Sequence, residues 1–151
     1  SRKIPTLISN NFTIIDSDNI CLYFDFISNK QTIFPKSNYW QIMTYISIAN
    51  DLMETILSRY METLRPDNKK SRDYIKKLEV RSLRIIDWFE KNLKFFHNEK
   101  LTMDKIAIAC ALEYTMFRFT NKWQESNKNL DLWLKSFKKN SFMKLTNPQI
   151  K

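Results

Sequence analysis

Few residues of this chain belong to the types that most often do chemistry. There is one histidine, His97, and two cysteines, Cys21 and Cys110. A HExxH zinc site needs two histidines, and a Cys-His dyad would require His97 to meet one of two thiols that lie among apolar neighbours. We therefore expect His97 in an exposed loop at a helix end, both cysteines as buried free thiols, and no metal site.

Glycine is absent from the sequence, although an average usage of about 7% would give roughly ten. The Walker phosphate loop, the GxGxxG dinucleotide turn and the GxSxG nucleophile elbow all need glycine where the backbone turns tightly or approaches a ligand. The sequence excludes these three motifs.

Short polar and acidic side chains offer the remaining candidates. Asp16 and Ser17 follow a β-prone run and are of the types that cap a helix, so from spacing alone a plain N-cap is favoured for them. Pro5 alone favours a strand edge, with a bulge or a cis bond at a ligand site as alternatives. Glu113, in an apolar helix, is expected to pair with Arg118 or a nearby hydroxyl.

The formal charge of +9 raises the question of nucleic acid. The basic residues are nevertheless spread along the chain, and those of 69–84 alternate with apolar residues as on the solvated face of a helix. We do not expect nucleic-acid binding. No apolar run approaches the roughly 20 residues that span a bilayer, and the start of the sequence has no secretory h-region. We therefore expect no membrane span and a cytoplasmic location.

These residues must be positioned by the following elements. Residues 3–8 and 12–15 predict a hairpin, because two β-prone runs flank the polar turn Ser9-Asn10-Asn11. Apolar residues then recur in steps of three or four, which predicts helices. Residues 106–112 are apolar all round, which predicts an enclosed central helix with Thr102 as its N-cap. The tail should pack through Phe142 and Leu145. The expected helices are 17–26, 38–64, 69–93, 102–120 and 130–140.

At this point the sequence resembles the glutathione transferase family, bacterial type, without roughly the first 50 residues of the family's sequence. The order and spacing of several stretches together carry the resemblance. Those stretches are KIPTLI (3–8), IIDSDNICLYFD (14–25), ANDLME (49–54), IDWFEKNL (86–93) and the capped helix 102–119.

The resemblance implies a mainly α protein. A partial thioredoxin-like α/β unit, a hairpin plus a helix, would occupy residues 1–28, a linker 29–37, and an all-α glutathione transferase C-terminal helical domain 38–151. A homodimer is expected, with the helix after Ser17 and the first long helix as contributors.

The resemblance also implies a site. The peptide groups of Ile4 and Pro5 would bind the cysteinyl backbone of glutathione, and Asp16 and Ser17 its γ-glutamyl end. By analogy, the wall of a second-substrate pocket includes Trp40, Tyr45 or Met53.

The implied activity is conjugation of glutathione, as substrate, to an electrophilic small molecule, a detoxification reaction. The residue that activates the thiol in this family would precede residue 1, so no catalytic residue is assigned here. The alternative is a non-catalytic interaction or dimerisation module of the same fold. A basic helical nucleic-acid binder comes third, and it would show affinity that falls steeply with salt.

Overall fold

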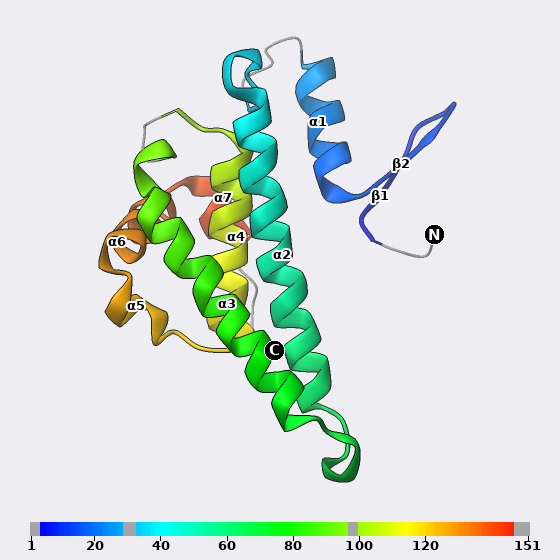
Figure 1. Cartoon of the computed structure of the whole chain (residues 1–151). Helices are drawn as coiled ribbons and strands as arrows, with labels where there is room; N and C mark the ends of the chain where they lie inside the picture. The colour runs from blue at the N-terminus through cyan, green and yellow to red at the C-terminus, as the bar shows by residue number, and fades with distance from the viewer. Residues whose placement is uncertain (1–3, 29–32, 97–99, 147–151) are drawn as a thin grey trace.

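A computed structural model describes residues 4–28, 33–96 and 100–146. Along the chain, a small hairpin leads into one helix and then into a bundle of helices (Figure 1). Short 3-10 turns precede α2 and α3 and follow α3. The strands are β1 (Thr6–Ile8) and β2 (Thr13–Ile15), and the helices are α1 (Ser17–Ile27), α2 (Tyr39–Thr63), α3 (Arg72–Asn92), α4 (Met103–Arg118), α5 (Trp123–Ser126), α6 (Lys128–Phe137) and α7 (Ser141–Leu145).

The predicted hairpin is confirmed. β1 and β2 pair antiparallel, with Thr6 opposite Ile15 and Ile8 opposite Thr13. The Ser9 N–H donates to the Phe12 carbonyl at 3.0 Å and closes the turn. Among the described residues β1 begins at Thr6, after a cis Ile4–Pro5 peptide. The strand starts later than the predicted residue 3, because Pro5 has no N–H to donate to a ladder hydrogen bond.

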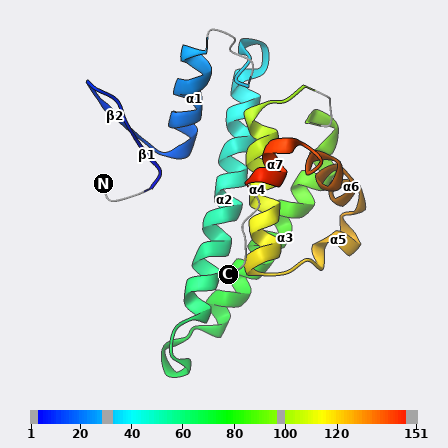
Figure 2. The same ribbon diagram turned by 180° about the vertical axis from the view of Figure 1, so that it is seen from behind.

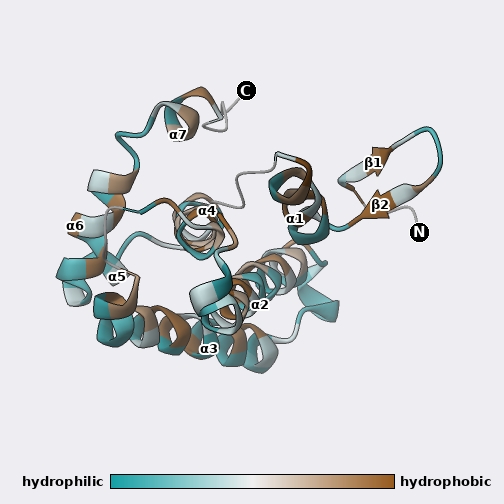
Figure 3. Ribbon diagram, turned by 90° about the horizontal axis from the view of Figure 1, so that it is seen from above, coloured by the Kyte–Doolittle hydropathy of each residue, from teal (hydrophilic) through white to brown (hydrophobic). Residues whose placement is uncertain are grey.

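The core forms around α4, which lies at the centre of the view in Figure 3 with α1, α2, α3, α6 and α7 around it. α4 contacts α2 most extensively and also α6. Ile108, Ala109 and Leu112 are completely buried in this core. The prediction of a central helix is confirmed. The prediction that it is enclosed on every side is wrong, because Cys110 is exposed.

The cysteines differ in their surroundings. Cys21 of α1 is half-buried and packs against the core, whereas Cys110 lies on the more open side of α4 together with the exposed Phe117. Both are free thiols. The expectation that both are buried is therefore wrong for Cys110, since an apolar run in sequence does not reveal which side of a helix its neighbours cover.

Two long helices precede α4, as predicted, and their ends follow local signals. α2 ends at Thr63, just before the Leu64-Arg65-Pro66 run, because the residue before proline avoids the α region. α3 begins at Arg72 rather than near residue 69, since Ser71 is its N-cap and accepts from the Tyr74 N–H at 3.3 Å.

The expected side-chain cap at Thr102 is not formed. Thr102 has the extended backbone of an N-cap residue, but its side chain makes no capping hydrogen bond. The Met103 N–H instead donates to the Ile33 carbonyl at 2.9 Å. The start of α4 is therefore satisfied by the segment that follows α1, a tertiary contact that local sequence does not reveal.

Up to residue 146, the last that the structure describes, the chain after α4 forms three short helices rather than one helix and a tail. α5 was not predicted, and α6 starts at Lys128 rather than Leu130. Phe142 of α7 packs on Phe137 at a ring distance of 5.9 Å, as expected. Leu145 is 85% exposed, so the expectation that it packs on the bundle is wrong. Figure 2 shows α7 beside α4 from behind.

α1 is joined to the bundle by specific contacts. The buried Asp25 carboxylate accepts from the N–H groups of Ile33 (3.1 Å) and Phe34 (3.2 Å). Phe34 and Pro35, at the end of the predicted linker, are themselves buried. Residues 29–32 lie outside the described residues, and the division into two domains stays a prediction. No described helix is long and apolar enough to cross a membrane.

Candidate functional site

The register of the hairpin brings the predicted glutathione residues to one place. Thr6 pairs with Ile15, so Pro5, which precedes Thr6, and Asp16, which follows Ile15, lie at the same end of the hairpin. α1 begins there with Ser17 and contacts both strands. Pro5, Asp16 and Ser17 are exposed, and Ile4 is 92% exposed. Residues eleven apart in sequence therefore share a solvent-facing corner.

Asp16 has an unusual backbone. Its φ of 77° and ψ of 133° make it the one described non-glycine residue with positive φ. Such a conformation costs about 1–3 kcal/mol and persists where the surroundings impose it. The Asp16 Oδ1 atom accepts from the Asp18 N–H at 3.0 Å, and the Asp16 carbonyl accepts from the Ile20 N–H at 3.0 Å. The N-cap interpretation of Asp16 is thus confirmed.

After capping, this corner can still bind both an anion and a cation. The first N–H groups of a helix have no acceptor within the helix, and the positive end of the helix dipole attracts an anion. Ser17 adds a hydroxyl donor, whereas the carboxylate of Asp16 accepts from a cation. An α-amino acid end carries both an ammonium and a carboxylate. The corner therefore has the donors and acceptors that such an end needs.

The electrostatics beside the corner favour a cation. Asp18 lies one residue beyond Ser17, and burial raises the pKa of its carboxyl, with a further increase from the charge of Asp16. A hydrogen bond from Asn50 works in the opposite direction without cancelling these effects. A positive charge near this corner would stabilise the ionised form of Asp18.

The residues proposed for a second substrate have separate surroundings. Tyr45 is buried, with its ring 5.4 Å from that of Trp88 and 5.6 Å from that of Phe96. Trp40 is 80% exposed. Met53 is half-buried against the core. The contacts of Tyr45 are those of a core residue, and a pocket formed with Trp40 and Met53 stays a prediction.

The other titratable candidates have structural partners. Glu113 pairs with Lys138 at 2.8 Å, so Arg118 is not its partner as the sequence suggested. Glu113 and Arg118 are five positions apart, and a helix places residues with this spacing on different sides. His97 lies outside the described residues. Within the described ranges, no group of three or more His, Cys, Asp and Glu side chains could hold a metal ion.

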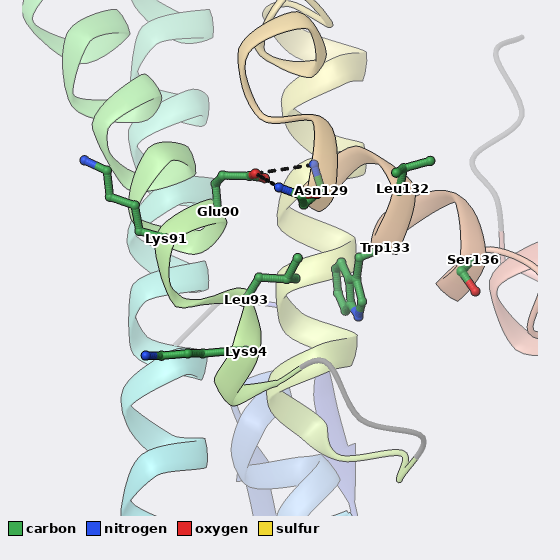
Figure 4. A pocket seen from close by; sticks show the side chains of 8 residues that line it. All are labelled: Glu90, Lys91, Leu93, Lys94, Asn129, Leu132, Trp133 and Ser136. Atoms are coloured by element: carbon green, nitrogen blue, oxygen red, sulfur yellow. Dashed lines mark hydrogen bonds between the residues drawn. The ribbon is translucent and has the colours of Figure 1, made fainter.

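Cavities open on the surface of the described chain next to α3, away from the predicted glutathione residues. One of about 550 Å³ lies between the end of α3 and α6 (Figure 4). Glu90 on its wall accepts from the N–H groups of Asn129 (3.3 Å) and Leu130 (2.6 Å), and the Asn129 side chain donates to it at 2.7 Å. Glu90 thus caps α6. Two more, of about 420 and 390 Å³, lie along α3.

Solved structures similar to this chain superpose over almost its whole length. One is a glutathione transferase family member from Pseudomonas fluorescens Pf-5, with bound glutathione. It matches with a TM-score of 0.89 and 23% sequence identity, and the aligned region covers 98% of this chain and 75% of that protein. The chain has the glutathione transferase fold. The fold class predicted from the sequence is therefore confirmed.

Two further structures with the glutathione transferase fold agree. A glutathione S-transferase from Methylobacillus flagellatus KT with glutathione bound has a TM-score of 0.87 and 23% identity over 97% of this chain and 76% of its own. A glutathione S-transferase from Methylobacterium radiotolerans JCM 2831, in complex with glutathione sulfonate, has a TM-score of 0.88 and 13% identity. The aligned region covers 99% of this chain and 74% of that protein. The chain thus spans about three quarters of these proteins. Neither a protein-family model nor a curated protein sequence matches it.

Proposed function

We propose that the protein binds glutathione at the corner formed by Ile4, Pro5, Asp16 and Ser17. The observation that carries this proposal is the hairpin register, which sets Pro5 beside Asp16 at the first turn of α1. It is supported by the glutathione transferase fold and by similar structures that contain glutathione.

Each part of glutathione has a counterpart in this corner. The γ-glutamyl carboxylate would accept from the N–H and the hydroxyl of Ser17, and the γ-glutamyl ammonium would donate to Asp16. The cysteinyl backbone would pair with the peptide groups of Ile4 and Pro5 in the manner of an added strand. The thiol would then be held next to the start of β1.

We further propose that the activity is transfer of glutathione to an electrophilic small molecule by a homodimer in the cytoplasm. The binding corner orients the thiol, and orientation of two reactants is a large part of such catalysis. Activation requires a lowered thiol pKa, and we assign that role to no residue of this sequence. Trp40, Tyr45 and Met53 remain the proposed contacts of the electrophile.

Titration calorimetry with glutathione tests the binding proposal. Ser17→Ala removes the hydroxyl, and Asp16→Asn removes the negative charge while keeping a good capping oxygen. We expect each to weaken binding about tenfold, which is roughly 1.4 kcal/mol. Ser71→Ala is the matched control, because Ser71 starts α3 away from the hairpin corner. Unchanged affinity in both variants at the corner would refute the assignment.

Two assays separate the enzyme from the non-catalytic module. Conjugation of glutathione to a chromogenic aryl halide reports transferase activity, and light scattering reports the dimer. Glutathione binding with measurable conjugation supports the enzyme. A dimer that neither binds nor conjugates glutathione would replace the proposal with an interaction or dimerisation module of the same fold.

A further inference from the structure

One side of α3 carries several cations around a single cavity. α3 lies at the edge of the bundle, beside α2 (Figure 3). Each residue that lines this cavity is three or four positions from another, so the helix brings all of them to one face. The cavity has a volume of about 420 Å³ and is lined by Asp73, Lys76, Lys77, Val80, Arg81 and Arg84. Its wall therefore holds four cations and one carboxylate.

The four cations differ in their partners. Arg81 donates from Nη2 to the Asp51 carboxylate of α2 at 2.5 Å, so its charge is compensated and its side chain is tied to the α2 side of the cavity. Over the described part of the chain, Lys76, Lys77 and Arg84 form no ion pair. All three side chains are exposed. An anion in the cavity can therefore reach three cations that no carboxylate neutralises.

A solvated helix face explains only part of this arrangement. It accounts for the exposure of the basic residues, as their alternation with apolar residues indicated. It does not favour their convergence, because Arg81 lies four residues after Lys77 and three before Arg84, and like charges at these spacings repel one another. Asp51 compensates one member of this row. A bound anion would remove the remaining repulsion.

The length and lining of the row specify the ligand. From Lys77 to Arg84 the helix rises about 10 Å, so an anion with a single charged centre meets only part of the row. Val80, 58% exposed, is the one apolar residue among the six that line the cavity. The lining has no aromatic ring on which a base could stack. Ammonium and guanidinium groups both bind phosphate oxygens. A chain of phosphate groups without bases or a large apolar body fits these features.

We propose that Lys76, Lys77, Arg81 and Arg84 form a binding site for inorganic polyphosphate. The phosphate oxygens accept from the two ammonium groups and from the Arg84 guanidinium group, while Asp51 holds Arg81 at the side of the cavity nearest α2. The site lies apart from the hairpin corner and does not depend on glutathione binding. Tripolyphosphate has the required chemistry and serves as the probe.

Nitrogen-15 NMR and calorimetry with tripolyphosphate test the site, with monophosphate as the comparison. We expect tripolyphosphate to shift the amide signals of residues 73–84 to saturation while those of α6 stay in place. It should bind about tenfold more tightly than monophosphate, because it meets more of the row. No saturable shift in α3, or equal affinity for the two anions, would overturn the proposal without any bearing on glutathione.

An oligothymidylate with three phosphates distinguishes polyphosphate from nucleic acid. It carries phosphate groups and bases, and the bases have no stacking surface in this cavity. We expect it to bind more weakly than tripolyphosphate. Tighter binding of the oligothymidylate would overturn the proposal in favour of a nucleic acid.

Paired variants sharpen the test. Lys77→Gln together with Arg84→Gln removes two charge-assisted contacts and should weaken tripolyphosphate about tenfold. Lys139→Gln together with Lys144→Gln, at exposed positions near the end of the described chain, is the matched control with the same change in net charge. Equal weakening by the two pairs would show that net charge alone attracts the anion, and would overturn the site. If the α3 variant does not fold, the wild-type NMR titration still decides.

Discussion

Asn50 of α2 donates a hydrogen bond of 2.6 Å from its side-chain amide to Oδ2 of Asp18 on α1. The bond joins the helix that carries the candidate glutathione corner to the longest helix of the bundle. Burial makes the pKa of Asp18 higher than its ordinary value in spite of this bond. The folded protein therefore keeps a proton on Asp18 to a higher pH than the unfolded chain does.

Asp18→Asn should remove part of the pH dependence of stability. A carboxyl group whose pKa is raised by folding binds more protons in the folded state, so its contribution to stability falls as pH rises above the ordinary value of 3.8. The asparagine side chain can still accept a hydrogen bond from Asn50, but it has no proton to lose, so its contribution to stability does not fall as pH rises. Urea unfolding at a series of pH values should show the variant gaining on the wild type as pH rises. Asp73→Asn, in the first turn of α3, controls for the lost charge, and a pH-independent difference would contradict the explanation.

Asp25→Ala should destabilise the protein substantially. The buried carboxylate accepts from two N–H groups, those of Ile33 and Phe34. Alanine has no acceptor, so both N–H groups lose their hydrogen-bond partner. Orphaned buried donors cost about 1–3 kcal/mol each, so we expect a loss of roughly 2–4 kcal/mol in the free energy of unfolding. Denaturant titration measures the loss. Glu125→Ala, at an exposed position of α5, should change stability by less than about 0.5 kcal/mol; an Asp25→Ala loss of similar size would show that the two bonds matter little.

Glu90→Ala should loosen the start of α6. The N–H groups of Asn129 and Leu130 lose their acceptor, which is equivalent to removing an N-cap, so the unfolding free energy should fall by about 1–2 kcal/mol. Hydrogen exchange of α6 amides should rise more than that of α2 amides. Lys91→Ala, from the same cavity wall, is the control. Uniform exchange changes in α2 and α6 would contradict a local capping role.

Cys110 should react slowly for an exposed thiol. Although the residue is exposed, the protein atoms around its sulfur partly remove it from water, and this desolvation, with smaller effects from the charges of Glu113 and Cys21, raises the pKa of Cys110 above its ordinary value of 9.0. Only the thiolate attacks an alkylating agent. In Cys21→Ser protein, iodoacetamide should therefore modify Cys110 more slowly at pH 7 than it modifies free cysteine, and adding Glu113→Gln should increase the rate. A rate equal to that of free cysteine would refute this.

Much of the fold follows from periodicity. The lengths and approximate ends of α2, α3 and α4 follow from apolar residues in steps of three or four, because long amphipathic helices repeat that signal many times. α5 has four residues, too few for any period to show. The predicted side-chain cap at Thr102 was wrong for another reason. The start of α4 is satisfied by the Ile33 carbonyl, which accepts from the Met103 N–H and lies about seventy residues away in sequence.

Part of the candidate site could likewise be predicted from the sequence. The proximity of Pro5 and Asp16 follows once a hairpin is assumed, because register relates residues on opposite strands. Outside that site, the contacts of Arg118 with the rings of Tyr60 and Phe117 depend on how α2 and α4 pack, and the sequence instead suggested Glu113 as its partner. The one available signal was an arginine next to aromatic residues, in Phe117-Arg118-Phe119.

The contacts of α1 also have a consequence for synthesis. Cys21 and Leu22 pack on a core that includes residues of α4, and α4 is translated long after α1. At roughly 5–20 residues per second, the ribosome needs several seconds to make the intervening chain. For that interval the apolar side of α1 has no finished bundle to cover it. Cys21 and Leu22 therefore stay open to solvent during synthesis for longer than the residues of α2, whose first partners are made sooner.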